Sequence, residues 1–339
     1  MIRFIAGRAA SSVVTIFGAS VIGFVLLRVL PGDPARLVAG HLASAQAVAT
    51  MRRVLGLNLP LYDQYGRYIG DFFQGNWGFS YSVGQPVRAL IAARLPASLE
   101  LGCYAFLLAF AAALLLALLS VRRRPADRAV RGLSFLGLGT PPFWLALLLL
   151  LLLSQWLHVF PGPEGRLSPN TAAPPALTHF YTVDALLAGR FGVFADAVRH
   201  LVLPTVTLAF ADFAFLVRLL RASLFEVSRE PFMAVVRSKG IGRPAALRRH
   251  ALPNAFLPTL TVGGLVLAEL IAGSVLVETV FDWPGVGALV VASIQREDYA
   301  VVETFILLSA VVYVVVNLIV DVLYGVIDPR VRLRSAVPK

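Results

Sequence analysis

Charged side chains are scarce in this sequence. They make up only 14% of the 339 residues, whereas a soluble domain has about 25%. Hydrophobic residues account for 58% of the chain, and the mean hydropathy is +0.77. So few charges cannot cover a water-facing surface, which excludes a soluble enzyme, a disordered chain and a coiled coil. The sequence predicts an all-α integral membrane protein.

Motifs for covalent, metal and nucleotide chemistry are also missing. The single cysteine, Cys103, excludes an intrachain disulfide, and the five histidines lie apart in loops or at the edges of apolar runs. Neither H-E-x-x-H nor G-x-S-x-G occurs, so we expect no catalytic residue and no metal site. The phosphate-binding pattern G-x-x-x-x-G-K-[ST] is absent too. We therefore expect this chain to bind no cofactor and not to hydrolyse ATP.

The apolar residues are concentrated in long runs. A helix needs about 20 apolar residues to cross the hydrocarbon core. Six segments meet this requirement, at roughly 9–30, 97–121, 133–157, 200–220, 256–278 and 303–327. The first run is too long for the apolar part of a signal peptide, and no A-x-A cleavage site follows it. The sequence predicts six transmembrane helices.

The net charge of +11 has two readings, a nucleic-acid surface or the cytoplasmic excess of Lys and Arg that orients membrane helices. If the amino terminus is cytoplasmic, nineteen of the thirty Lys and Arg fall in cytoplasmic segments and ten in outer ones. Six of those ten lie in the long segment 31–96, and long loops are translocated largely regardless of charge. Both termini are therefore predicted to be cytoplasmic, and no nucleic-acid partner is expected.

Two segments outside the spans are unusually long. Residues 31–96 follow the first span on the outer side and carry aromatic residues at near-helical spacing, which suit an interfacial belt or a docking element. Residues 221–254 form the largest inner loop. In that loop an apolar stretch with basic flanks predicts a short helix near 233–242, broken by Gly240 and Gly242. Such a helix lies on the membrane surface, connects two spans, or inserts into a partner protein as a lever.

Ionisable residues within the spans are candidates for a transport path. A carboxylate at the bilayer centre costs at least about 2.5 kcal/mol, so it normally faces a cavity or a partner. Asp212 and Glu269 lie in the fourth and fifth spans, and Glu278 lies at the end of the fifth. Gly273 allows close helix packing, or lines the path. We take Asp212, Glu269, Gly273 and Glu278 as candidates for the translocation path.

Several short motifs, in a fixed order, carry a family resemblance. The inner loop contains Ser238-Lys239-Gly240 followed by Arg249-His250-Ala251-Leu252-Pro253-Asn254. Other stretches are Pro31-Gly32-Asp33-Pro34, Glu278 to Gly287 and Arg296 to Tyr299. Together they resemble the dipeptide/oligopeptide branch of bacterial ATP-binding-cassette importer permeases, in particular the first of the two permease subunits. The resemblance covers residues 1 to about 332.

The resemblance implies a type I importer permease fold and a division of the chain. Residues 1–30 would hold the amino terminus and first helix, 31–96 an extracytoplasmic segment, 97–332 the permease core with the coupling loop 221–254, and 333–339 a cytoplasmic tail. It further implies a location in the bacterial inner membrane. The partners would be a second homologous permease, two ATPase subunits that bind ATP and magnesium, an extracytoplasmic solute-binding protein and a peptide substrate.

The same resemblance assigns roles to two groups of residues. The short helix between the fourth and fifth spans would couple to an ATPase subunit through Ala234, Val235, Val236, Arg237, Lys239, Gly240, Ile241 and Gly242. Phe281 and Trp283 would form an outer gate or contact the binding protein, or sit as ordinary interfacial aromatics. The solute stays open among dipeptides, oligopeptides, glutathione and nickel chelates. An ion-coupled secondary transporter is the main alternative from another class.

Several positions depart from the usual pattern of that family. Phe232-Met233-Ala234 stands where the loop motif begins with an acidic residue and two alanines, and Asn76 stands where an acidic residue is usual. Asp212 and Glu269 occupy positions where neutral residues are expected. These departures bear on the solute more than on the branch.

Overall fold

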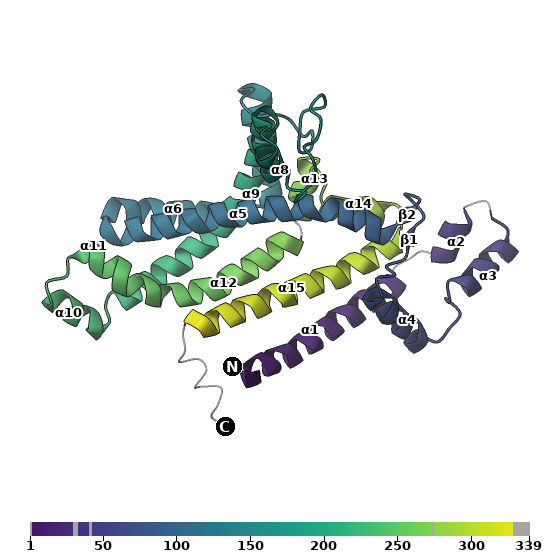
Figure 1. The fold of residues 1–339 in the computed structure, drawn as a ribbon, viewed down its shortest axis with the longest axis horizontal. Coiled ribbons are helices and arrows are strands. Elements are labelled where there is room, and N and C mark those ends of the chain that lie inside the picture. Colours follow the sequence, from purple (N-terminus) through teal and green to yellow (C-terminus); the bar gives the residue numbers. More distant parts are fainter. Residues whose placement is uncertain (1, 30–32, 41–42, 273, 328–339) are drawn as a thin grey trace.

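The computed structural model describes residues 2–29, 33–40, 43–272 and 274–327. Long helices dominate it (Figure 1). The longest are α1 (Ile2–Val29), α5 (Val87–Arg122), α9 (Phe191–Val227), α12 (Leu252–Ala272) and α15 (Tyr299–Ile327). By length and composition, the described residues contain four helices able to cross a membrane, Val87–Arg122, Phe191–Val227, Arg243–Ala272 and Tyr299–Val320. In α1 the apolar stretch Ser11–Val25 is shorter.

The predicted span 133–157 is not one straight helix. It is divided between α6 (Arg124–Gly139) and α7 (Pro142–Leu149), and a π-helix, η1 (Leu150–Trp156), continues α7. The two parts are bent by 102°. Two consecutive prolines, Pro141 and Pro142, cause the break, because proline donates no backbone hydrogen bond and clashes with the preceding turn. Counted as one broken span, the pair raises the number of spans to five.

The predicted fifth span is also divided. Residues 243–272 form one continuous helical segment made of α11 (Arg243–Ala246), a π-turn η2 (Leu247–Ala251) and α12. The chain then continues as α13 (Val275–Val280) and α14 (Val286–Gln295). The span therefore ends at Ala272 rather than at residue 278, and Gly273 lies outside the described residues.

The segment after α1 folds into three short helices and a hairpin. These are α2 (Pro34–Ala39), α3 (Ala45–Val54), α4 (Leu61–Phe73), β1 (Phe79–Ser80) and β2 (Gln85–Pro86). The side chains of Asp33 and Ser44 accept hydrogen bonds from the first turns of α2 and α3, as good N-caps do. The antiparallel ladder pairs Phe79 with Pro86 and Ser80 with Gln85, a detail that the all-α prediction missed.

The buried core lies mainly between α5 and α9. Alanines recur every fourth residue along α5, at Ala105, Ala109, Ala113 and Ala117, and all are almost completely buried. Residues four apart share one face of a helix, and small side chains there let a second helix approach closely. Leu216, Leu220 and Leu224 of α9 belong to the same cluster. The short helix α8 (Tyr181–Leu187) leads into α9.

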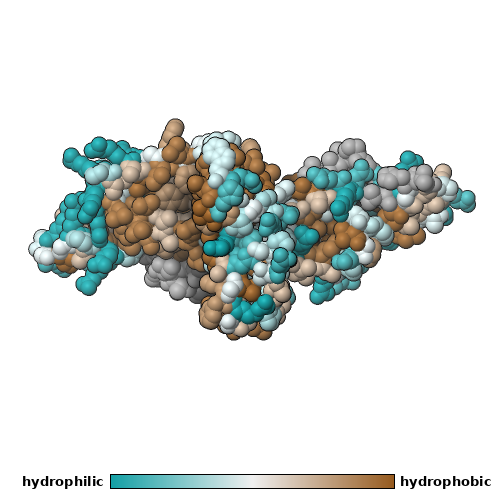
Figure 2. Space-filling view, turned by 90° about the horizontal axis from the view of Figure 1, so that it is seen from above, coloured by the Kyte–Doolittle hydropathy of each residue, from teal (hydrophilic) through white to brown (hydrophobic). Residues whose placement is uncertain are grey.

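The outer surface of the molecule is divided by polarity. Figure 2 shows apolar side chains over a broad area left of the centre and hydrophilic ones at the left-hand end, where α10 (Pro231–Ser238) and α11 lie in Figure 1; hydrophilic side chains are also present near the centre and toward the right. Highly exposed apolar residues include Leu107, Leu115 and Phe135. These exposed apolar side chains suit contact with lipid or with other membrane helices rather than with water.

Candidate functional site

The helix predicted near 233–242 is α10, which ends at Ser238. One face of it packs on the rest of the molecule. Met233 is 3% exposed and belongs to the main core cluster, and Val236 and Ile241 pack against that cluster. These three side chains hold α10 and the turn that follows it against the main core cluster.

The opposite face of α10 is open. Ala234, Arg237 and Lys239 are exposed, and Val235 is 56% exposed. Within the described part of the chain, neither Arg237 nor Lys239 forms an ion pair. The arrangement leaves an apolar residue and two cations available to a partner.

Gly240 ends this helix in a conformation that favours glycine. Its φ is +78°, and a Cβ placed there would meet no atom within 4 Å. Glycine adopts positive φ without the steric cost that other residues have. Gly242 then precedes α11 as its N-cap. The turn thus exposes its backbone on the surface of the loop.

A buried carboxylate joins α5 to the segment after α12. Glu278 of α13 is 1% exposed. It accepts a hydrogen bond from Ser98 Oγ at 2.7 Å and one from the backbone N–H of Ala288, in the first turn of α14, at 3.0 Å. Ser98 Oγ also accepts from the N–H of Val286. A negative charge is favourable at a helix N-terminus, and a Cβ at Gly285 would run into the Glu278 carboxylate.

The two predicted gate aromatics lie in this same joint. Phe281 is 4% exposed and Trp283 is 1% exposed, and both belong to the main core cluster. Trp283 Nε1 donates to the carbonyl of Ala97 at 2.9 Å. Between them, Asp282 has a positive φ of 50°. The structure brings Glu278, Phe281 and Trp283 together around the α5 segment that contains Pro96.

The other two path candidates lie on neighbouring spans. Asp212 is on α9 and is half-buried, and Glu269 is on α12 and is exposed. Helices α9 and α12 pack against each other, so the two carboxylates lie on adjacent spans.

Sequence reasoning gave no role to a second buried group. Glu100 on α5 and Arg166 in the loop between η1 and α8 are 1% and 8% exposed. Arg166 Nη2 donates to Glu100 Oε2 at 2.5 Å, and the guanidinium carbon lies 3.5 Å from the centre of the Tyr181 ring. The N–H and hydroxyl of Thr182 donate to Glu100 Oε1. The sequence contains one signal for this buried group. Glu100 is an acidic residue that closely follows Pro96, where the sequence is interrupted, and it could have been singled out for that reason.

The same loop is held by Asp184, which is also almost completely buried. Its carboxylate accepts hydrogen bonds from the backbone N–H groups of Leu177, Thr178 and His179 and from the Thr178 hydroxyl. Burial tends to raise the pKa of Asp184, but these hydrogen bonds stabilise the charged form and keep the pKa below its ordinary value.

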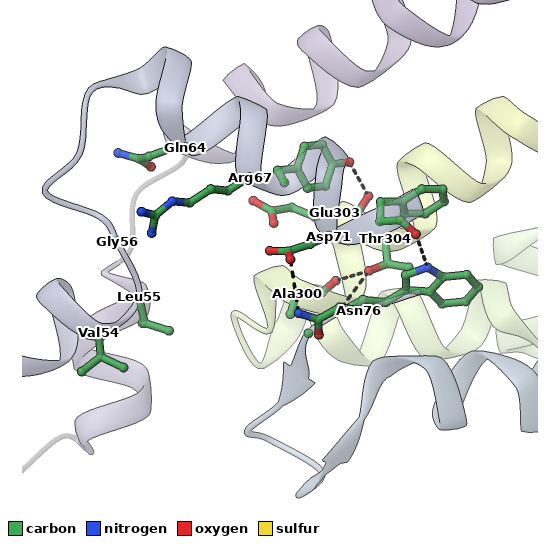
Figure 3. Close-up of a pocket in the computed structure, with 14 residues that line it drawn as sticks. Val54, Leu55, Gly56, Gln64, Arg67, Asp71, Asn76, Ala300, Glu303 and Thr304 are labelled. Atoms are coloured by element: carbon green, nitrogen blue, oxygen red, sulfur yellow. Dashed lines mark hydrogen bonds between the residues drawn. The ribbon is translucent and has the colours of Figure 1, made fainter. Parts of the chain in front are cut away.

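A pocket of about 350 Å³ lies beside α4 in the segment after α1 (Figure 3). Its walls come from the loop between α3 and α4, from α4 itself, from residues 76–78 and from the start of α15. Gln64 donates to the carbonyls of Leu57 and Leu59 and so holds the loop against α4. Arg67, Asp71 and Glu303 line the pocket and bring charges of both signs to it.

Metal chemistry has no visible support in the described ranges. No group of three or more His, Cys, Asp or Glu side chains there is placed to hold a metal ion.

The fold and these sites define a multi-spanning membrane protein with a short helix anchored on a loop between spans. Residues 105–333 match the family "Binding-protein-dependent transport system inner membrane component", and residues 1–102 match the N-terminal domain of such membrane components. The chain belongs to this family. It is the inner-membrane permease component of a binding-protein-dependent transport system, a transport subunit and not an enzyme.

Curated relatives resemble the chain over nearly its full length. The Escherichia coli K12 protein named "Probable D,D-dipeptide transport system permease protein DdpB" is 43% identical over 321 residues, 94% of each chain. A di/tripeptide transport system permease of Pseudomonas aeruginosa is 39% identical, covering 98% of this chain and 99% of the relative. An oligopeptide transport system permease of Bacillus subtilis is 36% identical over 98% of this chain and all of the relative.

Proposed function

We propose that this chain is one permease subunit of an ATP-driven importer and forms half of the translocation path for short peptides. The observation that carries the proposal is the similarity, over at least 94% of the chain, to relatives named for di-, tri- and oligopeptide transport. Dipeptides are the first choice of solute. Glutathione and nickel chelates are the alternatives within the same class of importer.

The proposed topology has six spans and cytoplasmic termini. Four long helices, the bent pair and α1 add up to that number if α1 spans the membrane. Support for the orientation comes from the ends of two helices, because the start of α1 and the end of α15 point toward the side of the molecule where α10 lies (Figure 1). That side also carries most of the basic residues of the inner loop.

In this proposal α10 is the coupling helix. Closure of the ATPase pair would move α10, and Met233, Val236 and Ile241 would transmit the movement to the long helices. Val235 and the turn at Gly240 and Gly242 would contact the ATPase subunit. Arg237 and Lys239 would pair with its acidic residues, because both are exposed and the loop around them is basic.

The path would pass between this chain and its partner permease. Asp212 and Glu269 would face it, and their two charges would favour the ammonium end of a peptide over an anionic solute. Gly273, which lies outside the described residues, is proposed for the same path from the sequence alone. Glu278 is too buried to touch the solute in this conformation, so we assign it to holding α14, beside the proposed gate residues Phe281 and Trp283.

The complete importer would contain a second homologous permease, two ATPase subunits that bind ATP and magnesium, and an extracytoplasmic binding protein.

The test is purification of the tagged chain from its native membrane in mild detergent, with identification of its partners by mass spectrometry. Recovery of those four partners supports the proposal, and titration of the recovered binding protein with dialanine, glutathione and a nickel chelate identifies the solute. Recovery of the chain alone, from membranes whose other importers survive the same detergent, contradicts it and favours a secondary transporter.

A further inference from the structure

We propose that the pocket beside α4 binds the two charged ends of a short peptide as it passes from the binding protein to the membrane path. Asp71 would take the α-ammonium group and Arg67 the α-carboxylate group. This inference rests on the proposed peptide import, which would make a peptide the natural ligand. The pocket by itself predicts only a small ligand that carries one positive and one negative charge.

The two charged side chains that α4 contributes to the pocket are kept apart, although their spacing in the sequence would let them meet. Arg67 and Asp71 are four residues apart on α4, a spacing at which opposite charges on a helix usually pair. Within the described part of the chain they form no ion pair with each other. The Asp71 carboxylate instead accepts a hydrogen bond from Asn76 Nδ2 at 3.3 Å.

Arg67 points to the opposite wall of the pocket. A Cβ placed on Gly56 would lie 3.2 Å from Arg67 Nη1, so the guanidinium reaches the turn after α3. Figure 3 shows the Arg67 side chain extending toward Gly56 and Leu55, while the Asp71 carboxylate lies on the side of Asn76. The pocket therefore holds one cation, Arg67, and two carboxylates, Asp71 and Glu303. Charges of both signs in one pocket complement a molecule with an ammonium group at one end and a carboxylate at the other.

The size and walls of the pocket fit a short peptide. Its volume of about 350 Å³ lies at the lower end of the range of small-ligand sites, about 300–1,000 Å³. The lining also includes Leu55, Trp77 and Ala300, which would accept apolar side chains. Trp77 is fixed in place, because its Nε1 donates to the carbonyl of Phe72 and its own carbonyl accepts from Thr304.

Binding is expected to be weak, and weak binding suits a site of passage. Both Arg67 and Asp71 are exposed, and ion pairs at exposed positions contribute little. A ligand that binds weakly leaves quickly, since affinity differences act mainly through the dissociation rate. A site of this kind would hold a peptide near the permease without competing with the binding protein.

The test measures binding of three probes to the assembled importer in lipid nanodiscs, without nucleotide or binding protein, by saturation-transfer NMR. The probes are dialanine, N-acetyl-dialanine and dialanine amide, which carry both charges, only the carboxylate and only the ammonium. The wild type should bind dialanine about two- to fivefold more tightly than either blocked probe. Asp71→Asn should reduce the preference for a free amino end without changing that for a free carboxyl end, because the Glu303 carboxylate remains. Arg67→Gln should remove the preference for a free carboxyl end alone.

Two matched variants serve as controls. Asp63→Asn removes a carboxylate from the same helix, and Arg53→Gln removes a guanidinium from α3; neither residue lines the pocket. Both should leave all three affinities unchanged. Equal affinities of the wild type for the three probes, or equal effects of a control and its test variant, would overturn the proposal. Failure of the importer to transport any peptide while these preferences persist would refute the proposed function and leave the pocket assignment standing.

Discussion

At the scale of single residues, the buried pair Glu100–Arg166 is the group most sensitive to change. Arg166 has one charged partner, and Glu100 also accepts two hydrogen bonds from Thr182. Removing one member of a buried ion pair leaves the other charge uncompensated, at a cost of about 3–5 kcal/mol. We expect Arg166→Gln to lower the free energy of unfolding by about that amount, measured by thermal or denaturant unfolding of the purified chain in detergent.

The control for this prediction is the double variant Glu100→Gln/Arg166→Gln. A neutral pair leaves no charge unpaired, and a glutamine side-chain oxygen still accepts from Thr182. The double variant should therefore be more stable than Arg166→Gln alone. If the single variant unfolds like the wild type, the pair does not hold the outer loop to α5.

Asp184 predicts a pH dependence of the outer loop. Its carboxylate has a pKa below the ordinary value of 3.8, so the folded state binds a proton less readily than the unfolded chain. This contribution to stability is complete above about pH 3.8 and is lost as the pH falls through the lower pKa of the folded state. Asp184→Asn should destabilise the loop at neutral pH by about 1.5–3 kcal/mol, because a charged acceptor is lost.

The measurement is thermal unfolding of the wild type and Asp184→Asn between about pH 6 and about pH 2.5. The difference in stability between the wild type and Asp184→Asn should be constant near the upper end of this pH range and should shrink near its lower end. Faster amide hydrogen exchange at residues 177–179 in Asp184→Asn reports the lost stability of this loop at neutral pH. A difference that grows as the pH falls would falsify this account.

At the scale of elements, the sequence predicted the long helices well and their interruptions poorly. Apolar length alone locates α5, α9, α12 and α15, because each must satisfy its backbone within the membrane. The 102° bend after α6 was missed, although Pro141 and Pro142 are visible in the sequence, because the hydropathy of the run continues across them. The hairpin at 79–86 was missed because two residues per strand give no alternating pattern.

The element with the clearest functional prediction is α10. Gly240 lies in open space with φ +78°, and a glutamate there would place a long charged side chain on the face proposed to contact the ATPase. We expect Gly240→Glu to leave membrane insertion and the amount of protein unchanged. ATP-driven uptake should be abolished, as measured with radiolabelled dialanine in cells.

The chain offers a matched control for that substitution. Gly84, in the hairpin, has φ +76° and also has no atom within 4 Å of a Cβ, so Gly84→Glu imposes the same backbone strain far from α10. It should retain most of the uptake. Full uptake by Gly240→Glu, or equal losses in both variants, would remove the evidence that α10 is the coupling element.

At the scale of the whole molecule, the candidate site was only partly predictable. The short helix and its glycine turn were located from residues 233–242, because apolar residues between basic flanks and glycines mark a local element. The burial of Glu278, Phe281 and Trp283 was not foreseen, because it depends on Ser98 and Ala97, which lie some 180 residues earlier in the chain. Contacts of that kind leave no periodic signal in the sequence.

The orientation of the whole chain provides the last prediction. The positive-inside count places α10 in the cytoplasm and α4 outside, and the single cysteine makes labelling straightforward. In a Cys103→Ala background, we expect a membrane-impermeant maleimide to label Gln74→Cys, at the exposed end of α4, in intact spheroplasts. Ser238→Cys, exposed at the end of α10, should react only after the membrane is permeabilised. The reverse pattern would invert the topology, and α10 would then be unable to reach a cytoplasmic ATPase.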